Sequence, residues 1–206
     1  MPSIYELKPA FQNLLRPIVR QLAKAGITAN QVTLAGFVLS SALGGLLWFN
    51  SHSSLVLLLV PAVQVFRMGL NAIDGMLARE FNMKTPLGAI LNELTDVLAD
   101  SILYYPFYKV LPAGNELVAP VIILSIIAEM TGVIGVQIGA SRRYDGPFGK
   151  SDRAFLFGLI ALLLGLGVNI TFAMTFVFSA MIILSIVTIV NRAQKALAEQ
   201  KEKIIF

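Results

Sequence analysis

Near the carboxyl end of the chain, residues 154–190 read AFLFGLIALLLGLGVNITFAMTFVFSAMIILSIVTIV and contain no charged side chain. A transmembrane helix needs about 20 consecutive apolar residues, so this stretch is long enough for two membrane spans. The segment GLGVN at residues 165–169 lies near its middle and favours a turn, because glycine and asparagine adopt turn conformations easily. We therefore predict two transmembrane helices, over residues 154–170 and 171–190.

The composition of the whole chain agrees with a membrane protein. Of its 206 residues, 56% are hydrophobic and 14% are charged, against about 25% charged residues in a typical soluble domain. Further apolar runs predict four more spans, at about residues 31–50, 55–77, 86–110 and 118–140. We therefore predict an all-α integral membrane fold with six transmembrane helices, in a single domain that covers residues 1–206.

The first 26 residues are too polar to span a membrane. Apolar side chains recur there at helical spacing, and Lys8, Arg16, Arg20 and Lys24 mark the opposite face. This pattern predicts that residues 1–26 form an amphipathic helix lying in the membrane interface. The alternative is an ordinary solvated helix that packs on a soluble core.

The basic residues indicate the orientation. Nearly all of the 16 Lys and Arg residues fall in the two terminal segments and in the loops after the second and fourth predicted spans. Because positive charge is retained on the cytoplasmic side, we expect both termini in the cytoplasm. The net charge of +4 then reflects topology and contact with membrane lipids, so we expect no nucleic-acid partner.

The chain contains no cysteine and a single histidine, His52. The absence of cysteine excludes a disulfide framework, a thiolate metal site and a cysteine nucleophile. One histidine excludes a metal site built from several histidines.

Two of the predicted spans carry polar side chains on one face. Spacings of three or four residues place each set on one side of a helix. The sets are Gln64, Arg67, Asn71 and Asp74 in the first of these spans, and Asn92, Asp96 and Asp100 in the second. Ionisable groups are costly inside a membrane and usually mark a function, and Asp and Asn oxygens suit Mg²⁺ or Mn²⁺. Structural hydrogen bonds between helices are the alternative.

Small residues lie between the two polar sets. Gly75, Ala78 and Gly88 let a ligand approach the helix backbone closely, and Arg79 can pair with a phosphate or hold a carboxylate. Glu129 lies inside the fourth predicted span. We expect it to be protonated or to bond across a helix interface, and we assign it no catalytic role.

A motif joins the two polar sets. It reads Asn71-x2-Asp74-Gly75-x2-Ala78-Arg79-x8-Gly88-x3-Asn92-x3-Asp96. It resembles the signature of the CDP-alcohol phosphotransferase (CDP-alcohol phosphatidyltransferase) family, D-x2-D-G-x2-A-R-x8-G-x3-D-x3-D, with every spacing kept. Asn71 and Asn92 replace the first and third aspartates. The resemblance extends over most of the chain and is nearest to bacterial inner-membrane members with the same two asparagines.

The resemblance implies an enzyme of phospholipid biosynthesis in the bacterial inner membrane, usually a homodimer, with its site at the cytoplasmic interface. Such an enzyme moves a phosphatidyl or substituted phospho-alcohol group from a CDP-linked lipid donor, such as CDP-diacylglycerol, to an acceptor hydroxyl, and it releases CMP. Members of the family use divalent metals, commonly Mg²⁺ or Mn²⁺.

The resemblance also implies roles for the motif residues. Asp96 is expected to be the catalytic base. The expected metal-site residues are Asn71, Asp74, Asn92 and Asp96. The expected CDP-donor residues are Asn71, Gly75, Ala78, Arg79 and Gly88. Because each asparagine removes one negative charge, we expect weaker metal binding, and Asp100 is a candidate for a further ligand that helical phase favours over Glu93.

The polar loop before residue 154 supplies candidate acceptor residues. Arg143, Lys150 and Arg153 resemble the basic residues with which other members bind acceptor phosphates, so they favour a phosphorylated acceptor. The alternative is that these three residues serve only as topology anchors.

Two other functions stay open at this point. A weakened or non-catalytic relative would bind nucleotide or lipid without transfer, and the two asparagines favour that alternative. A transporter would also place carboxylates among helices, but it predicts broken helices or repeated halves, and the sequence shows neither.

Overall fold

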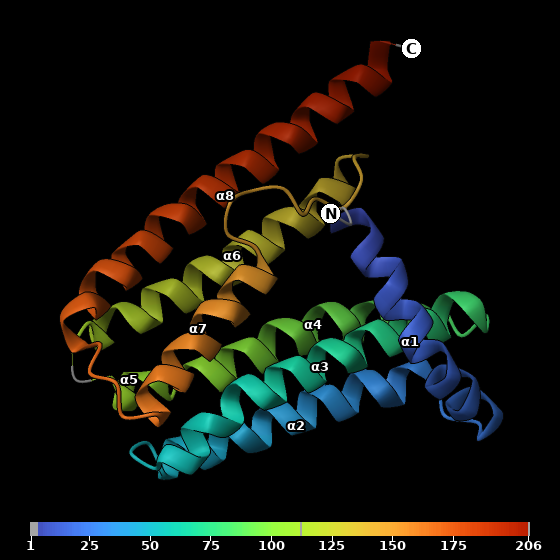
Figure 1. Ribbon diagram of the computed structural model, residues 1–206. Coiled ribbons are helices and arrows are strands. Elements are labelled where there is room, and N and C mark those ends of the chain that lie inside the picture. The colour runs from blue at the N-terminus through green and yellow to red at the C-terminus, as the bar shows by residue number, and fades with distance from the viewer. Residues whose placement is uncertain (1–3, 112, 206) are drawn as a thin grey trace.

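The computed structural model describes residues 4–111 and 113–205, and all the regular elements within these residues are helices. This confirms the predicted all-α class. The helices run in a bundle, with α1 crossing one end of it (Figure 1). Their bounds are α1 Ile4–Lys24, α2 Ala29–Phe49, α3 Ser54–Glu80, α4 Pro86–Tyr104, α5 Phe107–Val110, η1 Asn115–Leu117, α6 Val118–Gln137, α7 Lys150–Gly165 and α8 Thr171–Ile205.

Local sequence signals explain where two of the site helices begin. Thr28 caps α2, since its hydroxyl accepts a hydrogen bond from the Gln31 amide while the Gln31 side chain accepts one from the Thr28 amide. Thr85 caps α4, accepting a hydrogen bond from the amide of Gly88 at 2.9 Å. Pro86 follows at the first helical position, where the missing N–H costs nothing.

The ends of two helices, α4 and α8, differ clearly from the predicted spans. The span predicted to reach residue 110 ends as a helix at Tyr104, and α5 follows as a separate turn. Pro106 lies at this break and has no N–H with which to continue the helical ladder. At the carboxyl end, α8 continues to Ile205 instead of residue 190, because its polar last turns extend the helix beyond the apolar stretch.

Four helical segments are long and apolar enough to cross a membrane: α2, α3, Asn115–Gln137 and the segment Thr171–Lys203 of α8. Within the same bundle, α4 packs on α2, and α7 packs on α3. The α4 helix carries several carboxylates and α7 has only 16 residues. The count of six spans and the interfacial position of α1 stay predictions.

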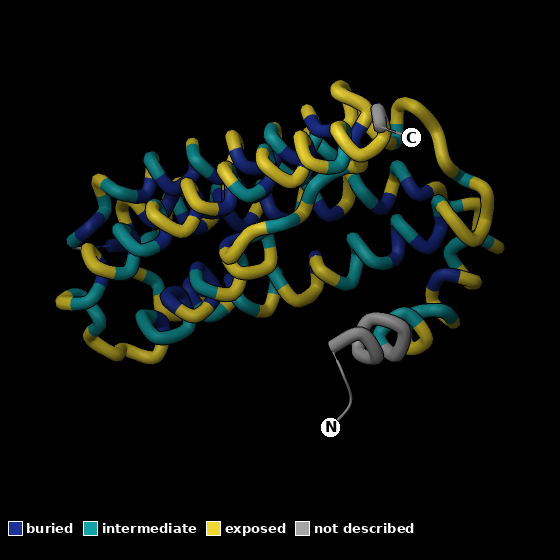
Figure 2. Tube along the Cα trace, turned by 90° about the horizontal axis from the view of Figure 1, so that it is seen from above, coloured by how far each residue is buried: buried dark blue, intermediate teal, exposed yellow. Residues whose placement is uncertain are grey.

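The main core joins residues of α2 to α8 at the end of the bundle opposite α1. There the ring of Tyr104 stacks on that of Phe157, with centroids 4.0 Å apart, and Phe107 and Phe178 contact Phe157 edge-on. A smaller cluster, including Val19 and Leu77, holds α1 against α3. Figure 2 shows exposed residues along the outer sides of the helices, as a membrane-facing surface requires.

Candidate functional site

The two predicted polar faces meet through side chains that reach between α3 and α4, two helices that both pack on α2. Asn71 on α3 donates from Nδ2 to Oδ1 of Asp96 on α4, at 3.4 Å. Asp74, one turn further along α3, accepts a hydrogen bond from the Thr33 hydroxyl of α2 at 2.9 Å. The structure therefore brings Asn71 and Asp96 together and adds Thr33, to which sequence reasoning assigned no role. The signal that could have identified Thr33 is its polar side chain near the start of an otherwise apolar helix, soon after the cap at Thr28.

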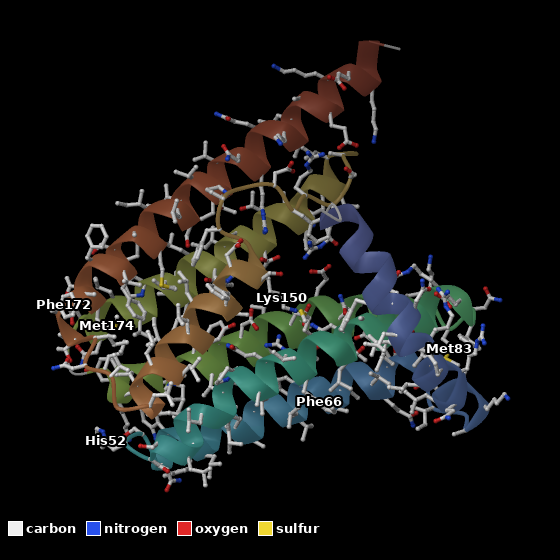
Figure 3. All side chains as sticks on the ribbon, viewed as in Figure 1. His52, Phe66, Met83, Lys150, Phe172 and Met174 are labelled. Carbon is white, nitrogen blue, oxygen red and sulfur yellow. The ribbon has the colours of Figure 1, made fainter. Side chains whose placement is uncertain are left out.

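Asp96 is the meeting point of three elements. Its Oδ1 lies 2.6 Å from Nζ of Lys150, the first residue of α7, and 3.4 Å from Nη2 of Arg67 on α3. Figure 3 shows Lys150 in the space between α7 and the neighbouring α3 and α4. About a quarter of the Asp96 side chain, 27%, stays exposed. A partly exposed carboxylate held by basic and amide partners can accept a proton from a bound hydroxyl.

Asp100, the candidate further ligand, lies one turn deeper on α4. It is buried and forms an ion pair with Arg67, which is buried as well. Each charge is thus compensated by the other. Its role as a metal ligand stays a prediction.

The other motif residues occupy different surroundings. Asn92 is exposed and lines a cavity together with Asp96. A Cβ added to Gly88 would lie 2.5 Å from Oδ1 of Asn30, so glycine here lets α4 approach α2. The Arg79 guanidinium folds back over Gly75, where an added Cβ would lie 3.0 Å from Nη2. Ala78 packs against the cluster that joins α1 to α3.

The donor set fits a divalent ion of the Mg²⁺ or Mn²⁺ type. Asp74 and Asp96 supply carboxylates, and Asn71 and Asn92 supply amide oxygens, which are the ligand types such ions prefer. Within the described part of the chain, no three His, Cys, Asp or Glu side chains cluster closely enough to hold an ion by themselves. These residues therefore suit an ion that takes its remaining ligands from water or from substrate phosphates.

A cavity of about 420 Å³ opens beside Asp96, between α4, α6, α7 and the loop before α7. Glu129 of α6 is central to its charge arrangement. Its carboxylate lies 2.9 Å from Nη2 of Arg153, 3.3 Å from Nη1 of Arg192 and 3.4 Å from Nη2 of Arg142. Glu129 thus bonds across helices, one of the two expected alternatives. Sequence reasoning gave it no part in a site, because its partners are distant in the chain.

Arg142, which the sequence did not single out, faces this cavity. It forms two hydrogen bonds to Glu93, both 2.6 Å long, and its guanidinium stacks on the Tyr144 ring. Burial acts to lower the pKa of Arg142, but the hydrogen bonds and the charge of Glu93 outweigh it and raise the pKa. Arg142 is therefore a fixed positive charge.

Of the three candidate acceptor residues, Lys150 and Arg153 line the cavity. Arg143 is not among the lining residues. It pairs instead with Asp145 at 2.8 Å and with Glu199 of α8 at 2.7 Å. The direction of two adjacent loop arginines could not be read from helical phase, because residues 138–149 are not helical.

A second cavity, of about 500 Å³, is an apolar groove between α3 and α7. Apolar side chains form most of its wall, including Val65, Phe155 and Leu159. At its polar end lie Asn71 and Lys150. Asp100, Lys150 and Ser151 line both cavities, so the two spaces adjoin at these residues. Asp96 lines the first cavity and contacts Lys150.

Comparison with known proteins gives one family match. Residues 26–190 match the family model described as CDP-alcohol phosphatidyltransferase. A similar relative is the inner membrane protein YnbA of Escherichia coli K12, 48% identical over 160 residues that cover 78% of this chain and 79% of YnbA. The archaetidylinositol phosphate synthase of Pyrococcus horikoshii is 30% identical over 100 residues, which cover 48% of this chain and 50% of the synthase.

The same fold occurs in a solved enzyme. The phosphatidylinositol phosphate synthase of Mycobacterium tuberculosis with CDP-DAG bound superimposes with a TM-score of 0.72 at 21% identity, covering 87% of this chain and 92% of the synthase. Its complex with manganese and citrate gives a TM-score of 0.73 at 20% identity, covering 88% of each chain.

Proposed function

Because this chain belongs to the CDP-alcohol phosphatidyltransferase family, we propose that it transfers a phosphatidyl or substituted phospho-alcohol group to an acceptor hydroxyl. The donor is a CDP-linked lipid, CDP-diacylglycerol, and CMP is released. The observation that carries the proposal is the position of Asp96, which lies where a polar cavity and an apolar groove adjoin and which contacts residues of α3 and α7.

The donor is assigned to the α3 side of Asp96. The CDP group lies along Asn71, Gly75, Ala78, Arg79 and Gly88, where Arg79 offers charge to a phosphate. The apolar groove between α3 and α7 suits the acyl chains, which would leave lipid for a similar environment.

Asn71, Asp74, Asn92 and Asp96 would hold one or two Mg²⁺ or Mn²⁺ ions. When bound, such ions supply positive charge that offsets the donor pyrophosphate and the departing CMP. The manganese complex of a protein with the same fold supports this choice of ions.

The reaction assigned to the chain's own residues is a direct displacement. The acceptor oxygen forms a bond to the phosphorus that carries the lipid, and the bond from that phosphorus to CMP breaks. The acceptor proton passes to the carboxylate of Asp96, which lies within contact range of both spaces. Arg67, 3.4 Å from Asp96, helps hold that carboxylate in position.

The acceptor is assigned to the cavity between α4, α6 and α7, because Asp96 lines that cavity and does not line the apolar groove. Lys150 and Arg153 contribute to its wall. Arg143 acts indirectly there, since it ties the loop that carries Arg142 to Glu199 of α8.

We place the enzyme in the bacterial inner membrane as a homodimer, with both termini and the site facing the cytoplasm. The name of its relative YnbA, an inner membrane protein, supports the location. The distribution of basic residues supports the orientation.

CMP release tests the proposal. Purified protein in lipid vesicles, supplied with CDP-diacylglycerol, Mn²⁺ and a mixture of alcohols, should release CMP, and chelation should abolish release. The D96N variant should lose at least about a hundredfold in rate, the usual worth of a general base. The matched control E116Q, an exposed carboxylate at the α5 end of the bundle, should keep the wild-type rate.

Two outcomes would contradict the proposal. Full activity of D96N would remove Asp96 from the chemistry. Binding of CDP-diacylglycerol without CMP release from any alcohol would favour a non-catalytic lipid- or nucleotide-binding relative.

A further inference from the structure

Resting on this proposed function, we infer that the acceptor is an uncharged polyhydroxy alcohol and carries neither a phosphate nor an ammonium group. The inference comes from the cavity beside Asp96, whose charged side chains already neutralise one another. It overrides the expectation of a phosphorylated acceptor that Arg143, Lys150 and Arg153 suggested.

The cavity wall holds nearly equal numbers of each charge. Five carboxylates and four cationic side chains line it. Arg67 does not line the cavity, but it pairs with the lining residue Asp100 and so supplies a fifth positive charge against the five carboxylates. A cavity built to attract a phosphate would present an excess of positive charge.

Each arginine of the cavity already donates hydrogen bonds to protein groups. Phosphate is held best by a guanidinium fork that donates two parallel hydrogen bonds. The Nε and Nη2 atoms of Arg142 both bind Glu93 at 2.6 Å. Arg153 donates to Glu129 at 2.9 Å, and Arg192 donates from Nη1 to the Ala128 carbonyl at 2.6 Å. A phosphate would have to displace Glu129 or lie beside it, and like charges in contact are strongly unfavourable.

An ammonium group meets the complementary obstacle. Of the carboxylates it could meet there, Glu93 and Glu129 are already paired with arginines. Asp152 is exposed and accepts a hydrogen bond from the Gly149 amide at 2.8 Å. An amino alcohol would therefore have to compete with guanidinium groups that are fixed in place.

Hydroxyl groups fit without any change in charge. A hydroxyl donates one hydrogen bond and accepts others, so it can bridge a carboxylate oxygen and a guanidinium N–H. Arg142 Nη1 is buried and has no hydrogen-bond partner within the described residues. The volume of about 420 Å³ lies within the range of small-molecule sites.

Lys150 is the one cavity cation whose partner, Asp96, belongs to the proposed catalytic centre. Lys150 also lines the apolar groove that we assign to the donor. We therefore assign its charge to the donor phosphates, so it adds no anion site for the acceptor.

An acceptor panel tests the inference on the wild-type protein in vesicles with CDP-diacylglycerol and Mn²⁺. The panel pairs glycerol with glycerol 3-phosphate and inositol with inositol phosphate, and adds serine and ethanolamine. We expect CMP release with a polyol at least about tenfold faster than with its phosphate ester or with either amino alcohol. Faster release with a phosphate ester or an amino alcohol would overturn the inference and leave the proposed function standing. No release with any acceptor would overturn both.

A charge-removing variant gives an independent reading. E129Q should free the guanidinium groups, so inorganic phosphate should raise its unfolding temperature while leaving that of wild type and of the control E116Q unchanged. In E129Q, the ratio of the CMP-release rate with a phosphate ester to that with the free polyol should also rise by about tenfold. If E129Q does not fold, E93Q, which frees the fork of Arg142, should show the same direction. Equal phosphate stabilisation of wild type would contradict the inference.

Discussion

Among single residues, the buried pair of Arg67 and Asp100 connects stability to the site. Arg67 also contacts Asp96, so the pair sets the position of the proposed base. Two buried charges of opposite sign compensate each other, while one left alone has no such compensation.

The R67M variant should therefore be strongly destabilised, by about 3–5 kcal/mol, because it leaves Asp100 buried without a partner. The double variant R67M/D100N should recover part of that loss, since it removes the uncompensated charge. Thermal unfolding in detergent measures both. A double variant as unstable as the sum of its single variants would show that the two residues do not act as a pair.

Replacement of Asn71 by aspartate should change both the stability of the protein and its response to metal. The Nδ2 atom of Asn71 donates to Asp96 at 3.4 Å, and an aspartate in its place would bring two like charges together. We predict that N71D lowers the unfolding temperature without metal and raises the stabilisation by Mn²⁺, with a midpoint about tenfold lower, because affinity rises with ligand charge. The control N115D, far along the chain in η1, should change neither quantity. A metal response unchanged from wild type would separate Asn71 from the metal site.

The helix pair α2 and α4 depends on close backbone contact. A Cβ added to Gly44 would lie 2.5 Å from the carbonyl oxygen of Ile102, whereas Gly45 has open space around the same position. We predict that G44A is destabilising by about 1–3 kcal/mol through overpacking. G45A should be neutral or slightly stabilising, since alanine favours helix over glycine. Equal unfolding temperatures for the two variants would show that the helices adjust freely.

The loop between α6 and α7 is tied to α8 through Asp145, which contacts Arg143 and Lys195, each at 2.8 Å. Burial acts to raise the pKa of Asp145, but these two cations outweigh it and lower the pKa below its usual value of 3.8. A carboxyl group with a lowered pKa stabilises the fold at pH values above its unfolded pKa, and this contribution is lost as the pH falls through the folded pKa. The difference in unfolding temperature between wild type and D145N should therefore be positive at pH 7 and shrink below about pH 4. A difference that grows on acidification would contradict this sign.

The elements also show how far sequence reasoning reaches. Apolar stretches located the helices, and helical spacing placed Asn71 and Asp96 on polar faces that the structure brings into contact. The break at Pro106 and the long α8 were missed, because hydropathy reports the membrane-facing part of a helix and not its polar continuation. Sequence reasoning missed Thr33 and Arg142, because each bonds to a residue of a helix that is distant in the sequence.

For the molecule as a whole, orientation in the membrane decides whether the proposed site faces the cytoplasm. The motif loop between α3 and α4 and the end of α8 lie at one end of the bundle, and the loop between α2 and α3 lies at the other (Figure 1). Basic residues concentrate at the first end, which the positive-inside rule assigns to the cytoplasm. Both termini and the site follow the same assignment.

The absence of cysteine from the chain makes this orientation directly measurable, because any thiol introduced is the only one present. We predict that H52C, at an exposed position in the loop between α2 and α3, reacts with a membrane-impermeant thiol reagent in intact cells whose outer membrane has been permeabilised. K84C in the motif loop and K201C near the end of α8, also exposed, should react only after the inner membrane is opened. Each variant serves as the control for the others, since all three should react fully in detergent. Labelling of K84C before H52C would show the opposite orientation and contradict the proposed cytoplasmic position of the site.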